Sequence, residues 1–195
     1  MKTRSASRWQ ANAGQTRTAI LIALSLFLPT ALAAGSRPNV ILVMADDLGW
    51  GDPQCFNESS PIRTPNLDAM AAAGLKFNRF YSAAPVCSPT RGSCLTGRHP
   101  FRYGVYSANV GHMTQDELTL PEFLREAGYA TGHFGKWHMG PDDLITEGTY
   151  GLDEIKVIGN SKDKTVGRDD DLTSAAIDFI KANADKPFYV NIWGH

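Results

Sequence analysis

Three short segments of this 195-residue chain read as β-strands: Asn39–Met44, Tyr129–Phe134 and Pro187–Trp193. The first is an uninterrupted apolar, β-branched run, which is typical of a parallel strand buried on both faces. Segments with helical signals separate the three strands. Alternation of strands and helices in this way predicts an α/β fold with a largely parallel sheet flanked by helices.

The first helical segment lies between Thr64 and Gly74. A threonine followed by proline is a common helix start, and glycine is a common stop. The apolar spacing predicts that this helix turns Leu67, Met70 and Ala71 inward.

Two further helices are predicted later in the chain. Leu120–Ala127 contains a proline in its first turn and is followed by a glycine. The other follows Asp169–Asp171 and carries apolar residues at helical spacing: Leu172, Ala176, Phe179 and Ile180. We do not interpret the three aspartates as a metal site, because acidic residues in the first turn of a helix are stabilised by its dipole.

The segment Pro85–Arg98 carries the strongest signal for chemistry. A serine and a proline predict a helix over Ser88–Thr96, which Gly97 ends. Cys87 then lies just before a helix N-terminus, where unpaired N–H groups and the dipole stabilise a thiolate or a bound anion. Arg91, one turn along, adds a permanent positive charge. The pattern indicates a nucleophile that meets an anionic substrate.

The two other cysteines do not suggest a disulfide framework. Cys87 and Cys94 are seven residues apart, which on a helix separates their Cα atoms by about 10 Å, too far for a disulfide. We expect Cys94 to act as a small buried hydrophobic residue. Cys55 lies in a polar loop and has no role that the sequence assigns.

Asp46 and Asp47 follow the first strand directly. Open α/β sheets bind ligands at the carboxyl ends of their strands, and paired carboxylates favour Ca²⁺ or Mg²⁺ over zinc. Successive strand residues point in opposite directions, so both can reach one ion only if the strand ends near Asp46. The alternative is a solvated acidic turn. Two adjacent aspartates are more often such a turn than a metal site when no other feature is considered.

The segment Gly135–Gly140 follows the strand Tyr129–Phe134 and carries a cation and an imidazole two residues apart. Residues i and i+2 of an extended chain share a face, so Lys136 and His138 could converge on one anion. The alternative is a surface loop in which the two residues are incidental. The polar, glycine-containing segment 102–115 is expected to be a loop.

The N-terminal part of the chain has the pattern of a secretory signal peptide. Basic residues precede the uncharged run Thr18–Leu28, and Ala31-Leu32-Ala33 provides small residues at a cleavage site. We therefore expect cleavage after residue 33 and export to the periplasm or beyond. An uncleaved membrane anchor is the alternative, although the apolar run is short of the roughly 20 residues of a span. The net charge of −1 gives no indication of nucleic-acid binding.

Taken together, three of these segments resemble the motifs of the sulfatase family. Cys87–Arg98, Cys-Ser-Pro-Thr-Arg-Gly-Ser-Cys-Leu-Thr-Gly-Arg, is similar to the family signature Cys/Ser-x-Pro-x-Arg with its Thr-Gly-Arg close. Ala45–Asp52 and Gly135–His138 resemble two other motifs in the same order. The resemblance runs from Asn39 to His195, and it implies an alkaline-phosphatase-like α/β fold.

The resemblance also implies the chemistry of the site. A maturation enzyme would oxidise Cys87 to formylglycine, an aldehyde that works as its hydrate. Arg91 would steady this hydrate, and Lys136 and His138 would contact the hydrate and the sulfate. An unmodified thiol could attack sulfur but would have no second hydroxyl with which to expel sulfate.

The cation implied by the resemblance is usually Ca²⁺, with Mg²⁺ as the alternative. Asp46, Asp47 and modified Cys87 would bind it. The family's further metal ligands and a second substrate-binding lysine would lie beyond His195, so we expect residues 34–195 to be the N-terminal portion of a truncated catalytic domain. A histidine after the last strand is expected near the sulfate, which makes His195 a candidate, unless that histidine lies just past the chain end.

These expectations define a sulfuric ester hydrolase acting on a sulfated polysaccharide or an aryl sulfate. Its other partners would be the formylglycine-generating enzyme and the export machinery. Two alternatives stay open at this point. One is a phosphate or phosphonate ester hydrolase of the same superfamily, and the other is an inactive fragment.

Overall fold

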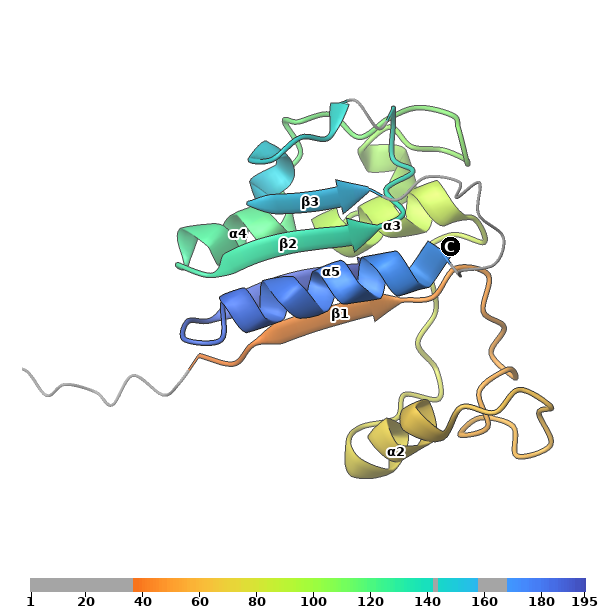
Figure 1. Cartoon of the computed structure of the whole chain (residues 1–195). Helices are drawn as coiled ribbons and strands as arrows, with labels where there is room; N and C mark the ends of the chain where they lie inside the picture. The colour runs from red at the N-terminus through yellow and green to blue at the C-terminus, as the bar shows by residue number, and fades with distance from the viewer. Residues whose placement is uncertain (1–36, 142–143, 158–167) are drawn as a thin grey trace, which may run out of the picture. The chain divides into compact units, whose positions relative to one another are not determined.

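A computed structural model describes residues 37–141, 144–157 and 168–195. These residues form a four-stranded sheet with the order β1-β4-β2-β3, in which every pair of neighbours is parallel. Figure 1 labels β1, β2 and β3. The strands are β1 (Val40–Met44), β2 (Ala130–Gly135), β3 (Glu154–Val157) and β4 (Phe188–Trp193). The predicted α/β fold with a parallel sheet is confirmed.

The helices lie at the positions that the local signals predict. They are α2 (Pro65–Ala73), α3 (Cys87–Thr96), α4 (Leu120–Glu126) and α5 (Arg168–Ala182), with two short 3-10 turns, η1 (Pro100–Arg102) and η3 (Thr149–Gly151). Thr119 and Glu122 form a reciprocal capping box that begins α4. The segment after η1 is a loop with a single bridge between Ser107 and Val110, as expected.

Alternating side chains of β4 divide the core into two layers. Phe188 and Val190 pack against α5, whose residues Ala176 and Phe179 are buried as predicted. Trp193 faces the other layer, which holds Leu95 of α3 and the tryptophan, tyrosine and methionine residues of the loops. Helix α5 therefore covers one face of the sheet (Figure 1), and the α3 side covers the other.

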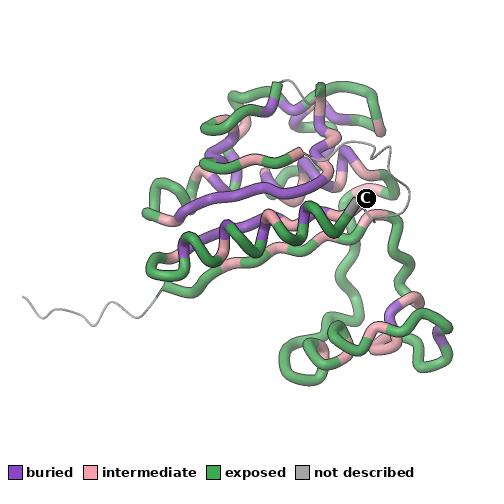
Figure 2. The backbone as a smooth tube through the Cα atoms, viewed as in Figure 1, coloured by how far each residue is buried: buried purple, intermediate pink, exposed green. Residues whose placement is uncertain are grey.

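Two packing predictions are wrong in this structure. Strand β1 lies at the edge of the described sheet, where it pairs with β4, and one of its faces is left uncovered: Ile41 and Val43 are 50% and 65% exposed instead of buried. Helix α2 contains no buried residue, and Leu67 and Met70 are 43% and 69% exposed. Figure 2 shows this contrast between exposed α2 and β2, which is buried along its length. Helical spacing defines a face, but tertiary contacts decide whether anything covers that face.

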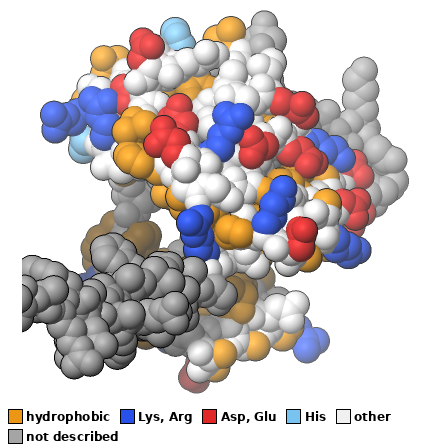
Figure 3. Space-filling model, turned by 90° about the vertical axis from the view of Figure 1, so that its left-hand side faces the viewer, with side chains coloured by type: hydrophobic (Ala, Val, Ile, Leu, Met, Phe, Trp, Pro, Cys, Tyr) orange, Lys and Arg blue, Asp and Glu red, His pale blue; other side chains and the backbone are white. Residues whose placement is uncertain are grey.

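The predicted signal peptide and the cleavage site after residue 33 lie outside the described residues. Among the residues that are described, no helix combines the length and apolarity needed to cross a membrane. On the face shown in Figure 3, acidic and basic side chains are interspersed rather than grouped by sign.

His133 occupies the centre of the sheet and is fully buried. Its ring makes edge contacts with Trp137 and Trp193, at centroid distances of 5.3 and 5.0 Å. Burial, together with the positive charge of Arg91, lowers the pKa of His133 to about 3. The imidazole is therefore neutral in the folded protein at neutral and mildly acidic pH.

Replacing His133 by phenylalanine is expected to flatten the acid side of the stability profile. Between pH 6.5 and about 3, the unfolded chain binds a proton at His133 that the folded chain does not, so stability falls by about 1.4 kcal/mol per pH unit as pH decreases. The free energy of unfolding, measured with urea at pH 7.5 and at pH 5, should fall between the two pH values by about 2 kcal/mol less in His133→Phe than in the wild type. The exposed His99→Phe variant is the control, and an unchanged difference in His133→Phe would contradict the prediction.

Candidate active site

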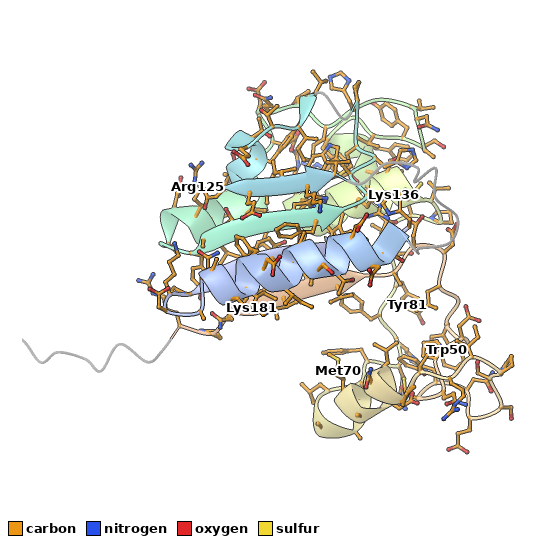
Figure 4. The ribbon with its side chains drawn as sticks, in the orientation of Figure 1. Trp50, Met70, Tyr81, Arg125, Lys136 and Lys181 are labelled. Carbon is orange, nitrogen blue, oxygen red and sulfur yellow. The ribbon has the colours of Figure 1, made fainter. Side chains whose placement is uncertain are left out.

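The carboxyl ends of β1, β2 and β4 meet at one edge of the sheet. Met44 and Gly135 are both in register with Trp193. The chain segments that follow these three residues therefore leave the sheet side by side. Lys136 lies at this end of β2, whereas Arg125 and Lys181 lie towards the opposite end of the sheet (Figure 4).

Helix α3 brings Cys87 to the same edge. The helix begins at Cys87 itself, with Val86 in extended conformation as its N-cap, so the predicted start at Ser88 is one residue late. The cap provides no side-chain hydrogen bond, which is why the serine signal misplaced the start; Ser88 is instead buried inside the first turn. The predicted end is confirmed, since Gly97 has the left-handed φ of 65° that glycine adopts readily. Cys87 and Cys94 are both free cysteines in the structure.

Asp46 is held between two cations. Its Oδ1 accepts a hydrogen bond of 2.8 Å from Arg91, and its Oδ2 accepts one of 2.5 Å from Lys136. Burial alone would raise the pKa of Asp46, but the hydrogen bonds from Lys136 and Arg91 outweigh it and hold that pKa below its ordinary value. The carboxylate is therefore ionised at neutral pH.

Arg91 connects the three strand ends. Its side chain is 1% exposed, and besides Asp46 it donates to the carbonyl oxygens of Lys136 at 3.1 Å and Gly194 at 3.4 Å. Its guanidinium also lies 5.2 Å from the centre of the Trp193 ring. These contacts make Arg91 a brace between β1, β2 and β4, close to the first turn of α3.

His138 reaches Cys87 directly. The imidazole Nδ1 lies 3.1 Å from the Cys87 Sγ, and the Nε2 lies 2.8 Å from the Oδ1 of Asn109. Lys136 and His138 contact different groups at this edge of the sheet: Lys136 contacts Asp46, and His138 contacts Cys87. The chain is not extended through His138, whose φ is 56°, so the shared face expected from the i, i+2 spacing is not what brings them here.

Asp47 and His195 lie at the margins of the site. Asp47 is exposed and has a left-handed φ of 54°, so the chain turns at this residue and the strand ends as a shared ion site requires. The backbone N–H of His195 donates to Asp169 at 3.3 Å, and its Nδ1 is 3.8 Å from the same carboxylate. One member of the acidic run that begins α5 therefore contacts this edge of the sheet.

A cavity of about 710 Å³ opens beside these residues. Asp46, Asp47, Cys87 and Arg91 line it, and the aromatic side chains of Phe80 and Tyr81 form part of its wall. An anion in this cavity would meet the N-terminus of α3 and the guanidinium of Arg91, beside the carboxylates of Asp46 and Asp47. The geometry can support nucleophilic attack on an anionic ester.

The donors present suit part of a cation site. Asp46 and Asp47 offer hard carboxylate oxygens, but Ca²⁺ takes six to eight oxygen ligands. Both oxygens of Asp46 are already bonded to Arg91 and Lys136. Within the described ranges, no group of three or more histidine, cysteine, aspartate or glutamate side chains is arranged to hold a metal.

Two residues at the site are absent from the sequence-based expectations. Asn109 lies in a segment that is expected only to be a loop, and Asp169 is interpreted there only as a helix-dipole residue. Among the described residues other than glycine, four have a positive φ, and three of them are Asp47, Asn109 and His138. Strained backbone of this kind concentrates at functional sites, but it is visible only in the folded structure.

The parallel sheet flanked by helices, with Asp46 and Asp47 after β1 and Cys87 at the start of α3, is the arrangement of an alkaline-phosphatase-like α/β fold. The chain belongs to the sulfatase family, whose family model matches residues 38–192. It is 42% identical over 154 residues to N-acetylgalactosamine-6-sulfatase of Canis lupus familiaris, covering 73% of this chain and 29% of that protein. It is 46% identical over 148 residues to arylsulfatase A of Bos taurus, covering 72% of this chain and 29% of the relative.

Solved structures agree on the fold. The structure of BT4656 in complex with its substrate D-glucosamine-2-N,6-O-disulfate matches with a TM-score of 0.70 and 27% identity, over 82% of this chain and 34% of that one. PsFucS1 sulfatase from Pseudoalteromonas sp. matches with a TM-score of 0.71 over 94% of this chain and 48% of that one, and its 23% identity supports the fold alone. The chain spans less than a third of the length of the two curated relatives named above.

Proposed function

We propose that this chain forms the nucleophile-bearing part of an enzyme that hydrolyses sulfate esters, with a nucleophile made from Cys87. The observation that carries the proposal is the position of Cys87. It is the first residue of α3, it lies 3.1 Å from His138 and it lines the same cavity as Asp46. Membership of the sulfatase family supports the same reaction.

Sulfatases in general depend on formylglycine and a metal ion. One oxygen of the aldehyde hydrate would attack sulfur while the S–O bond to the departing alcohol breaks, and deprotonation of the second hydroxyl would then re-form the aldehyde and release sulfate. The Nδ1 of His138 is positioned to accept a proton from the side chain at position 87. Lys136 and the N-terminus of α3 would stabilise negative charge on the sulfuryl oxygens.

Pro89 and Arg91 would serve twice. On the unfolded chain, we propose that they mark Cys87 for the formylglycine-generating enzyme. In the folded protein Pro89 lies in the first turn of α3, and Arg91 steadies the adjoining edge of the sheet. An aldehyde at position 87 would therefore lie next to a fixed positive charge.

A divalent cation, with Ca²⁺ preferred over Mg²⁺, would be held by Asp46, Asp47 and the modified side chain at position 87. Its chemistry would be to neutralise the sulfuryl oxygens and favour the ionised form of a bound hydroxyl. The hard oxygens of the two aspartates support this choice. Lys136 would have to share or release Asp46 when the ion binds, because both carboxylate oxygens are engaged.

The proposed substrate is a sulfated polysaccharide. The names of N-acetylgalactosamine-6-sulfatase and the substrate of BT4656 both refer to sulfated amino sugars. Aryl sulfate is the simpler test compound, in line with arylsulfatase A.

We also propose that the protein is exported after cleavage next to Ala34, and N-terminal sequencing that found Met1 on the mature protein would contradict export by this route.

Rates with an aryl sulfate and the matching aryl phosphate test the reaction. The intact protein containing this chain is expected to prefer the sulfate by on the order of tenfold to 100-fold, because a phosphate dianion brings an additional charge that the site must balance. A preference for phosphate or phosphonate would favour the alternative hydrolase; the phosphonate monoester hydrolase of Agrobacterium radiobacter shares the fold at a TM-score of 0.67 and 19% identity. Failure to cleave either compound or a sulfated sugar would contradict the proposal.

A further inference from the structure

We infer that Asn109 is a positioning residue for His138: it fixes which ring nitrogen carries the proton and so presents an accepting nitrogen to the residue at position 87. The Oδ1 of Asn109 lies 2.8 Å from the Nε2 of His138, and the opposite ring nitrogen, Nδ1, lies 3.1 Å from the Cys87 Sγ. The three side chains are therefore connected by two successive contacts, from Asn109 to His138 and from His138 to Cys87.

In a neutral imidazole, the tautomer decides which ring nitrogen donates a hydrogen bond and which accepts one. One ring nitrogen carries a proton and donates, and the other accepts. An amide oxygen can only accept, so Asn109 favours the tautomer with the proton on Nε2. Nδ1 is then the acceptor, which is the form needed to take a proton from a hydroxyl at position 87.

The loop that carries Asn109 is built to hold this position. Backbone hydrogen bonds of 3.2 Å join Tyr106 N to Val110 O and Val110 N to Ser107 O, closing a tight turn around Asn109. Asn109 itself has a φ of 60°, a conformation in which asparagine is much more frequent than most residues. The side chain thus projects from a closed turn rather than from an open loop.

The same loop is fastened to the segment that carries His138. Met113 N donates to Met139 O at 2.9 Å, and both methionine side chains are 1% exposed. The hydroxyl of Tyr150 donates to the carbonyl oxygen of Met113 at 2.7 Å, which gives the segment after Asn109 a second attachment. The bond from Asn109 to His138 therefore joins two segments that are already held together, and little entropy is lost when it forms.

Three variants of the intact enzyme test the inference. Asn109→Gly removes the side chain but keeps the left-handed backbone, since glycine adopts positive φ without strain. Asn109→Asp keeps an accepting oxygen at the same place. Ser107→Ala changes a neighbouring side chain of the same turn and keeps its backbone hydrogen bond, so it controls for general damage to the loop.

The direct readout is the ¹⁵N spectrum of the histidine rings, with the His138 signals assigned by their loss in His138→Gln. The wild type, Asn109→Asp and Ser107→Ala are expected to carry the proton on Nε2, and Asn109→Gly is expected to show a mixture of tautomers. This measurement does not require turnover. It therefore decides the inference even if the proposed sulfatase activity, on which only the kinetic readout rests, is absent.

The kinetic readout separates positioning from substrate binding. Asn109→Gly is expected to lower kcat by about 10- to 100-fold, the usual cost of losing a partner that orients a catalytic histidine, and to change KM by less than about twofold. Asn109→Asp should recover part of kcat, and Ser107→Ala should behave as the wild type. An unchanged His138 spectrum in Asn109→Gly, or equal losses in Asn109→Gly and Ser107→Ala, would overturn the inference.

Discussion

Replacement of Cys87 by alanine is expected to abolish sulfate-ester hydrolysis by the intact enzyme while leaving the protein folded. Removal of a nucleophile that works together with a base and a charged site typically lowers kcat by a factor on the order of 10⁴ or more. The fold should survive because Cys87 is only partly buried and alanine is well suited to the first turn of a helix. Rates with an aryl sulfate and far-ultraviolet circular dichroism measure the two effects separately.

The same experiment identifies the chemical form of the nucleophile. The active enzyme should contain a peptide about 18 Da lighter at position 87 than the unmodified sequence, from replacement of CH₂SH by CHO, and this aldehyde should react with hydrazines. Cys87→Ser should also be inactive unless the host oxidises serine. Cys55→Ala, at an unpaired cysteine outside the cavity, is the matched control and should retain full activity. A fully active preparation that carried only free thiol at Cys87 would contradict the proposed mechanism.

Replacement of Asp46 by asparagine is expected to cost both activity and stability. The change removes the negative charge that both cations contact. Arg91, which is 1% exposed, loses its ion pair with Oδ1 of Asp46, and Lys136 loses its ion pair with Oδ2. Leaving a buried charge unpaired costs about 3 kcal/mol. We therefore expect urea unfolding to show a loss of this size, together with a loss of activity of at least about 100-fold.

Asp47→Asn provides the comparison within the same motif. Asp47 is exposed, so its loss should leave stability within about 0.5 kcal/mol of the wild type. Activity and bound-metal content should both fall if Asp47 binds the cation. Asp170→Asn, in the exposed first turn of α5, should change neither quantity. Full turnover and metal content in both Asp46→Asn and Asp47→Asn would rule out the cation site, and unchanged stability in Asp46→Asn would refute the role of the ion pairs.

Local signals in the sequence determined most of the elements. Apolar runs predicted β1 and β4, a short strand was expected where β2 lies, and the cap, proline and glycine signals predicted α2, α3 and α4, all to within one or two residues at each end. These predictions succeed because capping, turn formation and strand periodicity depend on residues only a few positions apart. The order of strands and helices was enough to predict a parallel sheet, because a short turn cannot join parallel strands.

Only the tertiary structure decided which faces are covered and which charges meet. Arg91 and Lys136 lie 45 and 90 residues from Asp46, and the ion pairs exist only because the carboxyl ends of β1 and β2 flank that of β4. Asn109 likewise reaches His138 across 29 residues through the packing of two loops. Helix α2 and strand β1 show that a sequence pattern alone does not predict burial. Their patterns define apolar faces, but whether these faces are buried depends on a partner elsewhere in the chain or beyond it. Local propensity thus specifies the elements, while long-range packing and electrostatics assemble the site.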